Sequence, residues 1–223
     1  MSAYADNPLK KLFSKALSAV FPRRCPFCRA LVSEKELICG ECTKKLPKTD
    51  YTRYAIGGFQ CCAPLPYKDE YARAVKSFKF GKKRDYAHAL AHLTAEATGK
   101  KLKFNDFDCV TCVPMHKRSL RNRGFNQAEA LAREFAKLTD LPYVELLEKY
   151  KANKPQHKLK RSERFKNVKG VFRVIDPAAV KDKRIILIDD IITTGSTLGE
   201  CSRQLKKSGA KAVCCSAVCA SML

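Results

Sequence analysis

Short apolar runs and segments of helical periodicity alternate along most of this chain. Runs of strand length stand at residues 108–113, 171–175, 185–188 and 212–220. Apolar or small residues at helical spacing fill 87–97, 127–138 and 198–208, and an amphipathic segment covers 8–21. Because buried strands that alternate with helices form parallel sheets, the pattern predicts an α/β fold, with a parallel sheet flanked by helices.

Two segments depart from this alternation because basic residues dominate them. Residues 68–84 interleave lysines and arginines with aromatic residues, and residues 151–169 carry eight basic residues against the single acid Glu163. The first segment fits an ordinary helix with solvated lysines, but equally a surface that binds single-stranded nucleic acid through phosphate contacts and base stacking. We interpret the second segment as a mobile flap. The candidate nucleic-acid-binding residues are Lys79, Lys82, Lys83, Arg84, Lys158, Lys160, Arg161 and Arg164.

The composition limits the classes of protein to consider. With 223 residues and 45% hydrophobic content, the chain can form one α/β domain of ordinary size and a small appendage. Its 44 basic residues against 22 acidic ones give a net charge of +22, which favours polyanionic partners. No apolar run approaches the ~20 residues that span a bilayer, and the N-terminus lacks a signal-peptide pattern. We therefore expect a cytoplasmic protein, with the inner face of the membrane as an alternative docking place for segment 8–21.

Two Cys-x-x-Cys pairs, Cys25 with Cys28 and Cys39 with Cys42, stand near the start of the chain. Pairs at this spacing can supply four thiolates to a tetrahedral structural Zn²⁺, and free or redox-active cysteines are the alternative. The adjacent Cys61 and Cys62 fit packing positions or an auxiliary metal site. We expect residues 1–65 to hold the N-terminal helix and the zinc-binding knuckle, and residues 66–223 to form the α/β domain.

The string from Arg184 to Glu200, RIILIDDIITTGSTLGE, concentrates the candidate chemistry. An apolar strand leads to the acidic doublet Asp189 and Asp190, and a loop of hydroxyl residues around a glycine leads into a helix. Carboxylates at a strand end can accept hydrogen bonds from vicinal hydroxyls, and a loop that enters a helix N-terminus can bind a phosphate. The string therefore predicts a sugar-phosphate site. The loop residues are Thr193, Thr194, Gly195, Ser196 and Thr197.

A second anion-binding loop is predicted where the strand at 108–113 ends. Basic side chains and Gly124 leave this strand and lead into the helix at 127–138. A run of solvated charges is the alternative, although Asn126 and Gln127 are not residues that solubility alone requires. The basic residues are His116, Lys117, Arg118, Arg121 and Arg123.

Together these motifs resemble the ComF family, competence-associated proteins in which a zinc finger is joined to a type I phosphoribosyltransferase-like domain. The resemblance lies in the two cysteine pairs, VPMHKRSLRNRGFNQA at 113–128, QHKLKRSERFKNVKGVF at 156–172 and DDIITTGST at 189–197. It implies that Asp189 and Asp190 contact the ribose of phosphoribosyl pyrophosphate (PRPP), and that residues 193–197 contact its 5′-phosphate. It also implies that 116–123 faces the pyrophosphate, with Arg121 or Arg123 at the leaving group, and that Mg²⁺ accompanies PRPP.

The resemblance implies a role in DNA uptake, and three activities stay open. The protein transfers the ribosyl group of PRPP to an acceptor that the sequence does not reveal, with Asp189, Asp190 and Arg123 as catalytic residues. Alternatively, it is a non-catalytic competence factor that binds single-stranded DNA and uses PRPP as a regulator, or it is a nucleobase salvage enzyme. Proteins of the DNA-import machinery are candidate partners, and the sequence predicts no oligomeric state.

Overall fold

The computed structural model describes residues 22–33, 35–81, 83–153 and 161–221. The contacts divide the chain into two units, Met1–Leu46 and Pro47–Leu223. The amphipathic helix predicted at 8–21 lies outside the described residues. Within the described residues, none of the helices is both long and apolar enough to cross a bilayer.

In the first unit, two backbone turns bring the cysteine pairs into position. Arg29, with a left-handed φ of 66°, donates its backbone N–H to the Cys25 carbonyl at 2.9 Å and so closes the first turn. The second pair surrounds the start of helix α2 (Gly40–Lys44), whose N-cap is Cys39. Each Cys-x-x-Cys pair therefore forms a tight turn, as the spacing predicts.

The second unit is built on a six-stranded sheet with the order β1-β2-β8-β7-β4, in which β3 also pairs with β8. Its strands pair in parallel except for β1, which is antiparallel to β2 at one edge. The predicted parallel sheet is confirmed, with this one antiparallel addition. The strands are β1 (Arg53–Ala55), β2 (Phe59–Cys62), β3 (Leu65–Pro66), β4 (Cys109–Cys112), β7 (Arg184–Ile192) and β8 (Ala212–Ala220).

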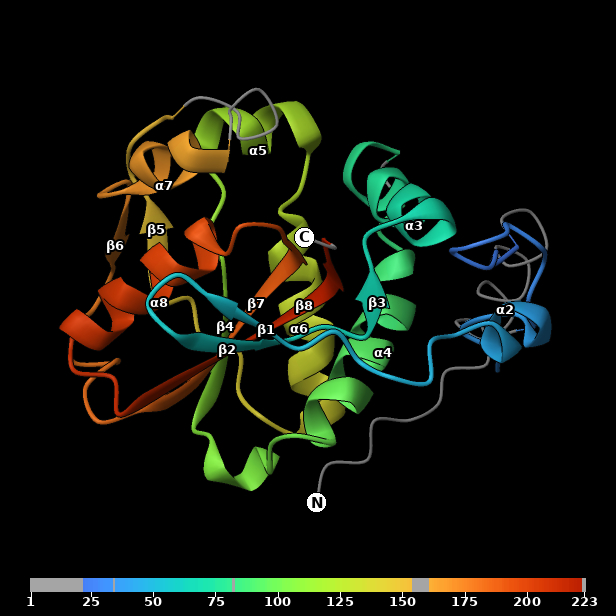
Figure 1. Cartoon of the computed structure of the whole chain (residues 1–223), viewed down its shortest axis with the longest axis horizontal. Helices are drawn as coiled ribbons and strands as arrows, with labels where there is room; N and C mark the ends of the chain where they lie inside the picture. Colours follow the sequence, from blue (N-terminus) through green and yellow to red (C-terminus); the bar gives the residue numbers. More distant parts are fainter. Residues whose placement is uncertain (1–21, 34, 82, 154–160, 222–223) are drawn as a thin grey trace, which may run out of the picture. The chain divides into compact units, whose positions relative to one another are not determined.

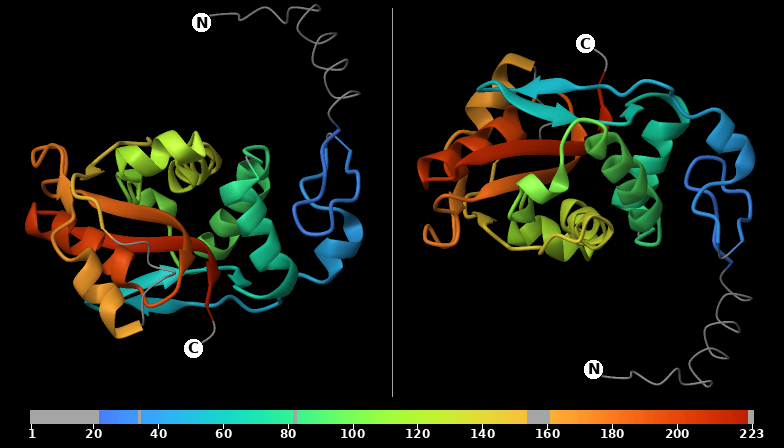
Figure 2. Two further views of the ribbon diagram at one scale, coloured as in Figure 1. Left: turned by 90° about the horizontal axis from the view of Figure 1, so that it is seen from above. Right: turned by 90° about the horizontal axis from the view of Figure 1, so that it is seen from below.

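Helices cover both faces of this sheet, which explains why most residues of its central strands are apolar (Figures 1 and 2). Helices α4 and α6 pack against each other and against the sheet, and α8 packs with α7 on the other face. A small second sheet pairs β5 with β6 in antiparallel fashion. These elements are α3 (Asp69–Phe80), α4 (Tyr86–Gly99), η1 (Phe104–Asp106), α5 (Lys117–Arg123), α6 (Gln127–Thr139), β5 (Leu147–Lys149), α7 (Arg161–Val168), β6 (Phe172–Val174) and α8 (Ser196–Lys207).

Strands β1 and β2 come from residues 1–65, which were expected to hold only the N-terminal helix and the zinc-binding knuckle. β1 and β2 lie before residue 65, yet β2 pairs with β8 through Cys61 opposite Cys215 and Cys62 opposite Ser216. The boundary expected between residues 65 and 66 thus differs from the division that the contacts give, between Leu46 and Pro47. Both adjacent cysteines are buried in the sheet, so they occupy packing positions.

Candidate functional site

The acidic doublet lies inside β7 rather than after it. Ile185 to Ile188 are buried between β4 and β8, and the strand continues through Asp189 and Asp190 to Ile192. Successive residues of a strand point to opposite faces, so the two carboxylates leave the strand in different directions. Asp189 is half-buried and Asp190 is buried, and the phosphate-loop sequence follows directly.

The two acids differ in their hydrogen-bonding partners. The backbone N–H of Asp190 donates to Asp189 Oδ1 at 2.8 Å, whereas Asp190 Oδ1 lies 2.8 Å from the Nζ of Lys79. Burial, together with the negative charge of Asp190, raises the pKa of Asp189 to about 7 against the opposing charges of Lys79 and Lys149. Near neutral pH, Asp189 therefore exchanges a proton easily while Asp190 is held in an ion pair.

Lys79 comes from the last turn of α3, and the sequence placed it in the candidate nucleic-acid stretch. Burial lowers the pKa of this lysine, but the charges of Asp190 and Asp189 outweigh that effect and the net shift is upward. A sequence signal for its inward position did exist. Lys79 continues, at four-residue spacing, the row that begins with the buried Tyr71 and Val75.

The predicted phosphate loop forms the junction between β7 and α8. Gly195 adopts a left-handed φ of 72° immediately before α8, and the hydroxyls of Thr194 and Ser196 lie 2.8 Å apart. α8 has twelve residues, and its N-terminus carries the partial positive charge that favours a phosphate. All five predicted loop residues thus stand next to the acidic doublet.

The β1–β2 hairpin packs closely against this junction. A Cβ atom on Gly195 would lie 2.6 Å from the Cα of Ala55, and a Cβ on Gly199 would lie 2.2 Å from the carbonyl oxygen of Ile56. Neither position accepts a side chain without moving the backbone. The sequence did not reveal Gly199 as a constrained position, because the segment that approaches it is far away along the chain.

The second predicted anion loop is a short helix, α5, rather than a loop. His116 forms its N-cap and accepts a hydrogen bond from the backbone N–H of Arg118 at 3.2 Å, and Gly124 ends the helix in the left-handed region. The side chains of Lys117, Arg118 and Arg121 are exposed. The basic residues therefore follow β4, as the sequence predicts, but they lie on a short helix and not in a loop.

Arg123 connects this basic helix to the acidic doublet. It is half-buried, donates to Gln127 Oε1 at 3.1 Å and lies over the ring of Phe80 at 4.9 Å. Gln127 in turn donates from Nε2 to the carbonyl of Lys79 at 3.4 Å. A chain of contacts thus runs from Arg123 through Gln127 to the lysine that pairs with Asp190.

The segment interpreted as a flap is partly ordered into α7 and anchored to α8. Arg164 donates from Nη1 to the Thr193 hydroxyl at 3.3 Å, and the backbone N–H of Gly170 donates to Glu200 Oε1 at 3.0 Å. Arg164 thus contacts the phosphate loop. Lys82, Lys158, Lys160 and the side chain of Arg161 lie outside the described residues, while Lys83 and Arg84 are exposed.

Lys149 on β5 is a site residue that the sequence patterns did not indicate. It is half-buried, and burial lowers its pKa; the charge of Arg123 acts in the same direction, and Asp189 acts against both. Lys149 therefore interacts electrostatically with both Asp189 and Arg123. Its short strand carries no motif, so no signal in the sequence could have found it.

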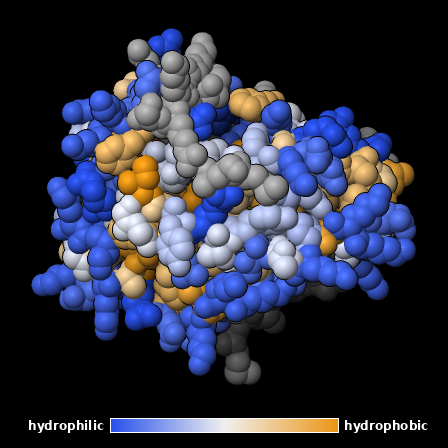
Figure 3. Space-filling model, in the orientation of Figure 1, coloured by the Kyte–Doolittle hydropathy of each residue, from blue (hydrophilic) through white to orange (hydrophobic). Residues whose placement is uncertain are grey.

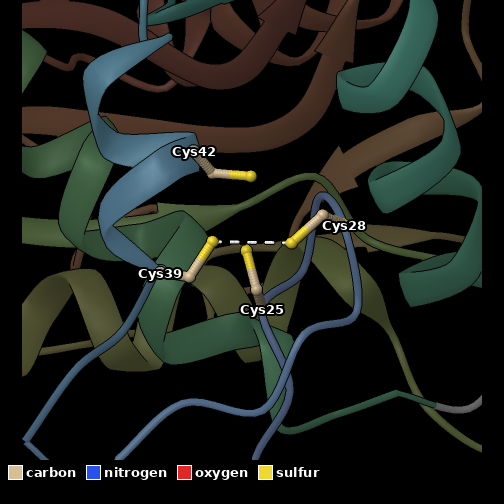
Figure 4. A group of neighbouring side chains, drawn as sticks. All are labelled: Cys25, Cys28, Cys39 and Cys42. Atoms are coloured by element: carbon tan, nitrogen blue, oxygen red, sulfur yellow. Dashed lines mark hydrogen bonds between the residues drawn. The ribbon is translucent and has the colours of Figure 1, made fainter.

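The first unit contains the group of cysteines predicted to bind a metal. Cys25, Cys28, Cys39 and Cys42 turn their sulfur atoms toward one another, as Figure 4 shows, and these atoms all lie within 4.8 Å of one another. Four sulfur atoms at about 2.3 Å from a tetrahedral Zn²⁺ stand about 3.8 Å apart, so the cluster fits this ion. With four thiolates and no open coordination position, such a zinc is structural.

Family comparisons match both units of the chain. The phosphoribosyl transferase domain matches residues 89–222, and the double zinc ribbon domain matches residues 16–56. Among the described residues, the four cysteines above form the only cluster suited to a metal. The comparisons and the cluster together support structural zinc.

Several curated proteins are similar to this chain over most of its length. The DNA utilization protein YhgH of Escherichia coli K12 is 27% identical over 85% of this chain and 80% of its own length. Competence protein F of Haemophilus influenzae is 27% identical over 84% and 82%. Competence protein ComFC of Streptococcus pneumoniae is 33% identical over 64% and 62%.

Solved structures are similar to parts of this chain at low identity and low TM-score. An adenine phosphoribosyltransferase from Thermoanaerobacter pseudethanolicus is 12% identical with a TM-score of 0.37, covering 81% of this chain and 98% of that one. The allosteric regulatory enzyme of purine biosynthesis is 22% identical with a TM-score of 0.39. In that case the match covers 59% of this chain and 25% of the enzyme.

Proposed function

Because the chain belongs to the phosphoribosyl transferase domain family, we propose that it binds PRPP at the junction of β7 and α8. The observation that carries this proposal is the placement of the acidic doublet directly before a left-handed glycine and a helix N-terminus. Asp189 and Asp190 accept hydrogen bonds from the ribose hydroxyls, and residues 193–197 bind the 5′-phosphate. The curated relatives confirm the resemblance to the ComF family, which joins a zinc-binding segment to this domain.

The pyrophosphate end of PRPP faces the basic helix α5 in this proposal. Arg123 is linked to the doublet through its contact with Gln127, which bonds to Lys79, and Arg121 is exposed on the same helix. Mg²⁺ bound together with PRPP would neutralise charge on the pyrophosphate. Arg123 supplies a fixed positive charge where negative charge develops on the leaving group.

If the protein transfers the ribosyl group, pyrophosphate leaves the anomeric carbon through an oxocarbenium-like state. The half-buried Asp189 and the ion-paired Asp190 then fix the ribose, and α7 brings Arg164 to the loop that binds the 5′-phosphate. None of these groups acts as a nucleophile, so orientation and electrostatics provide the catalysis. The acceptor decides whether this activity is salvage of a nucleobase or a reaction on incoming DNA.

A second function, binding of single-stranded DNA, is favoured by the surface at the end of α3. Phe80 is 67% exposed, and Arg123 lies over its ring. Lys83 and Arg84 are exposed shortly after this residue, and hydrophilic side chains dominate the face shown in Figure 3. An exposed aromatic ring can stack on nucleic-acid bases, and the cations around it can pair with the phosphates. In keeping with its competence and DNA-utilization relatives, we place this function in the cytoplasm.

Calorimetry with Mg²⁺ and PRPP tests the proposed ligand. Asp190→Asn keeps the shape of the side chain but removes its charge, so we expect PRPP affinity to fall by about tenfold or more, as for a lost hydrogen bond to a charged group. Asp106→Asn is the matched control, because Asp106 is exposed on η1, close to Asp108, which bonds to Arg184 at the opposite end of β7 from the doublet. Equal binding by the wild type and Asp190→Asn, or no binding by either, contradicts the proposal.

Two further assays separate the candidate activities. Pyrophosphate release measured across nucleobases identifies a salvage enzyme by turnover with one base, and release only with single-stranded DNA identifies a DNA-linked transferase. Binding of single-stranded DNA without pyrophosphate release identifies a non-catalytic factor. In that binding assay, neutralising Lys83 and Arg84 lowers the slope of affinity against salt by about 0.7 for each DNA phosphate that these residues pair with. An absence of DNA binding at low salt removes the second function.

A further inference from the structure

We propose that Lys79 is a positioning residue of the PRPP site: it is the fixed counter-ion that holds the Asp190 carboxylate as an acceptor for the ribose. This inference deepens the proposed function and rests on it. The sequence motifs that resemble the ComF family place their site residues in 116–123 and 189–197, whereas Lys79 arrives from α3.

The structure holds Lys79 at several points. Its Nζ lies 2.8 Å from Asp190 Oδ1, and the two side chains are only 20% and 11% exposed. Its carbonyl accepts a hydrogen bond from Gln127, and the preceding Phe78 packs edge-on against Phe125 at 5.6 Å. The backbone that carries this lysine is therefore fixed on both sides of the side chain.

The ion pair is a preferred arrangement, not an accident of a crowded surface. Lys79 stands beside the strongly exposed Phe80, so its flexible stem could direct the ammonium into water at little cost. Withdrawing an ammonium and a carboxylate from water is costly unless the pair is close and well aligned. The 2.8 Å separation meets that condition.

Lys79 also gives Asp189 and Asp190 different roles. Two adjacent carboxylates repel each other in a buried place, and one cation balances only one of them. Lys79 pairs with Asp190, which leaves Asp189 as the acid that accepts a proton near neutral pH. Lys149 from β5 also lowers the pKa of Asp189, and the charge of Asp189 in turn raises the pKa of the buried thiols of Cys61, Cys112, Cys201 and Cys215.

An ammonium group has three N–H donors. Among the described residues, Asp190 is the only side chain that is hydrogen-bonded to Lys79 Nζ. The remaining donors are available to oxygen atoms of the bound sugar phosphate. Lys79 thereby orients Asp190 before PRPP arrives and adds positive charge to the site after it has bound.

The test compares Lys79→Met with Lys76→Met, because Lys76 is an exposed lysine of the same helix. In calorimetry with Mg²⁺ and PRPP, we expect Lys79→Met to weaken binding at least tenfold and Lys76→Met to change it by less than twofold. Lys79→Arg keeps the cation and should restore part of the affinity. Binding by Lys79→Met that equals or exceeds wild-type binding overturns the inference, and tighter binding would show that Lys79 competes with the ligand.

A measurement made in the absence of PRPP tests this inference independently of the proposed function. In carboxyl-carbon NMR titrations, removing the positive charge of Lys79 should move the titration of Asp189 to higher pH, whereas Lys76→Met should leave it unchanged. An unmoved titration overturns the inference. If wild-type protein binds no PRPP, the proposed function fails and this titration still decides the role of Lys79. Lys79→Gln, which retains one N–H donor group, replaces Lys79→Met if the latter does not fold.

Discussion

Glu200 joins the phosphate-loop helix to the segment that precedes β6, and its removal has a calculable effect. Its carboxylate is buried on α8 and accepts four hydrogen bonds: from Gly170 N at 3.0 Å, from Arg203 Nε at 2.9 Å and Nη2 at 2.6 Å, and from Gln204 Nε2 at 2.8 Å. Glu200→Ala leaves the Gly170 N–H without this partner and removes the hydrogen bond that joins α8 to the backbone just after α7.

The magnitude follows from burial and charge. Breaking a buried ion pair costs about 3–5 kcal/mol, but Arg203 is 38% exposed and regains water, so we expect a loss near the lower limit, about 3 kcal/mol. For a chain of this size, about 1 kcal/mol corresponds to about 2–4 °C in Tm. The predicted decrease in Tm is therefore about 6–12 °C.

The assay is thermal unfolding followed by circular dichroism, with Glu129→Ala as the control. Glu129 also pairs with an arginine of its own helix, Arg133 at 2.9 Å, but on the surface, where the pair contributes about 0.5 kcal/mol or less. A decrease for Glu200→Ala no larger than that for Glu129→Ala would refute the reasoning.

The pH dependence gives the same prediction a second test. Burial alone would raise the pKa of Glu200, but hydrogen bonds from Arg203, Gly170 and Gln204 outweigh it and lower the pKa below 4.5. The contribution of the Glu200 carboxylate to the free energy of unfolding is therefore complete above pH 4.5, and it disappears as the pH falls through the lowered pKa of Glu200. The difference in Tm between wild type and Glu200→Ala should narrow in acid, and a difference that stays constant down to about pH 2 contradicts the assignment.

Three further predictions concern the metal, the loop and the acidic doublet. Native mass spectrometry should find one zinc per chain, lost in Cys39→Ser; two zinc ions per chain would contradict the single four-cysteine site. Gly199→Ala should cost about 1–3 kcal/mol and weaken PRPP binding, because its Cβ would lie 2.2 Å from the Ile56 oxygen; unchanged unfolding and binding would contradict this. Burial raises the pKa of Asp189 from 3.8 to about 7, so its contribution to stability is complete below pH 3.8 and is lost as the pH rises through about 7. Asp189→Asn should therefore have a higher Tm than wild type at about pH 8 and an equal Tm at about pH 4. A lower Tm for Asp189→Asn than for wild type at about pH 8 would contradict this.

The sequence predicted what depends on local pattern. The strand that leads to Asp189, the glycine-centred loop and the four-cysteine cluster are all recognisable from neighbouring residues, and the structure places them as expected. α5 was predicted as a loop because basic residues and Gly124 suggested an irregular segment, whereas His116 caps a short helix there. The sequence thus located this basic segment after β4 but did not predict its backbone geometry.

The contacts that complete the site are long-range, and no local pattern encodes them. Lys79 meets Asp190 because α3 and β7 come together in the folded chain, and Ile56 meets Gly199 because the turn after β1 lies beside α8. Lys149 reaches the site from a short strand with no motif. The spacing of Lys79 from Tyr71 and Val75 indicates that it faces inward, but only the fold shows that Lys79 meets Asp190 and that Gly199 lies against a distant carbonyl.

The central claim, that PRPP binds where β7 meets α8, is tested most directly by hydrogen exchange with and without Mg²⁺ and PRPP. We predict slower exchange in peptides that cover residues 189–200 and 116–127, and a smaller change at both places in Asp190→Asn at the same PRPP concentration. Unchanged exchange at 189–200 in wild-type protein that binds PRPP by calorimetry would contradict the claim, because the ligand would then occupy another part of the molecule.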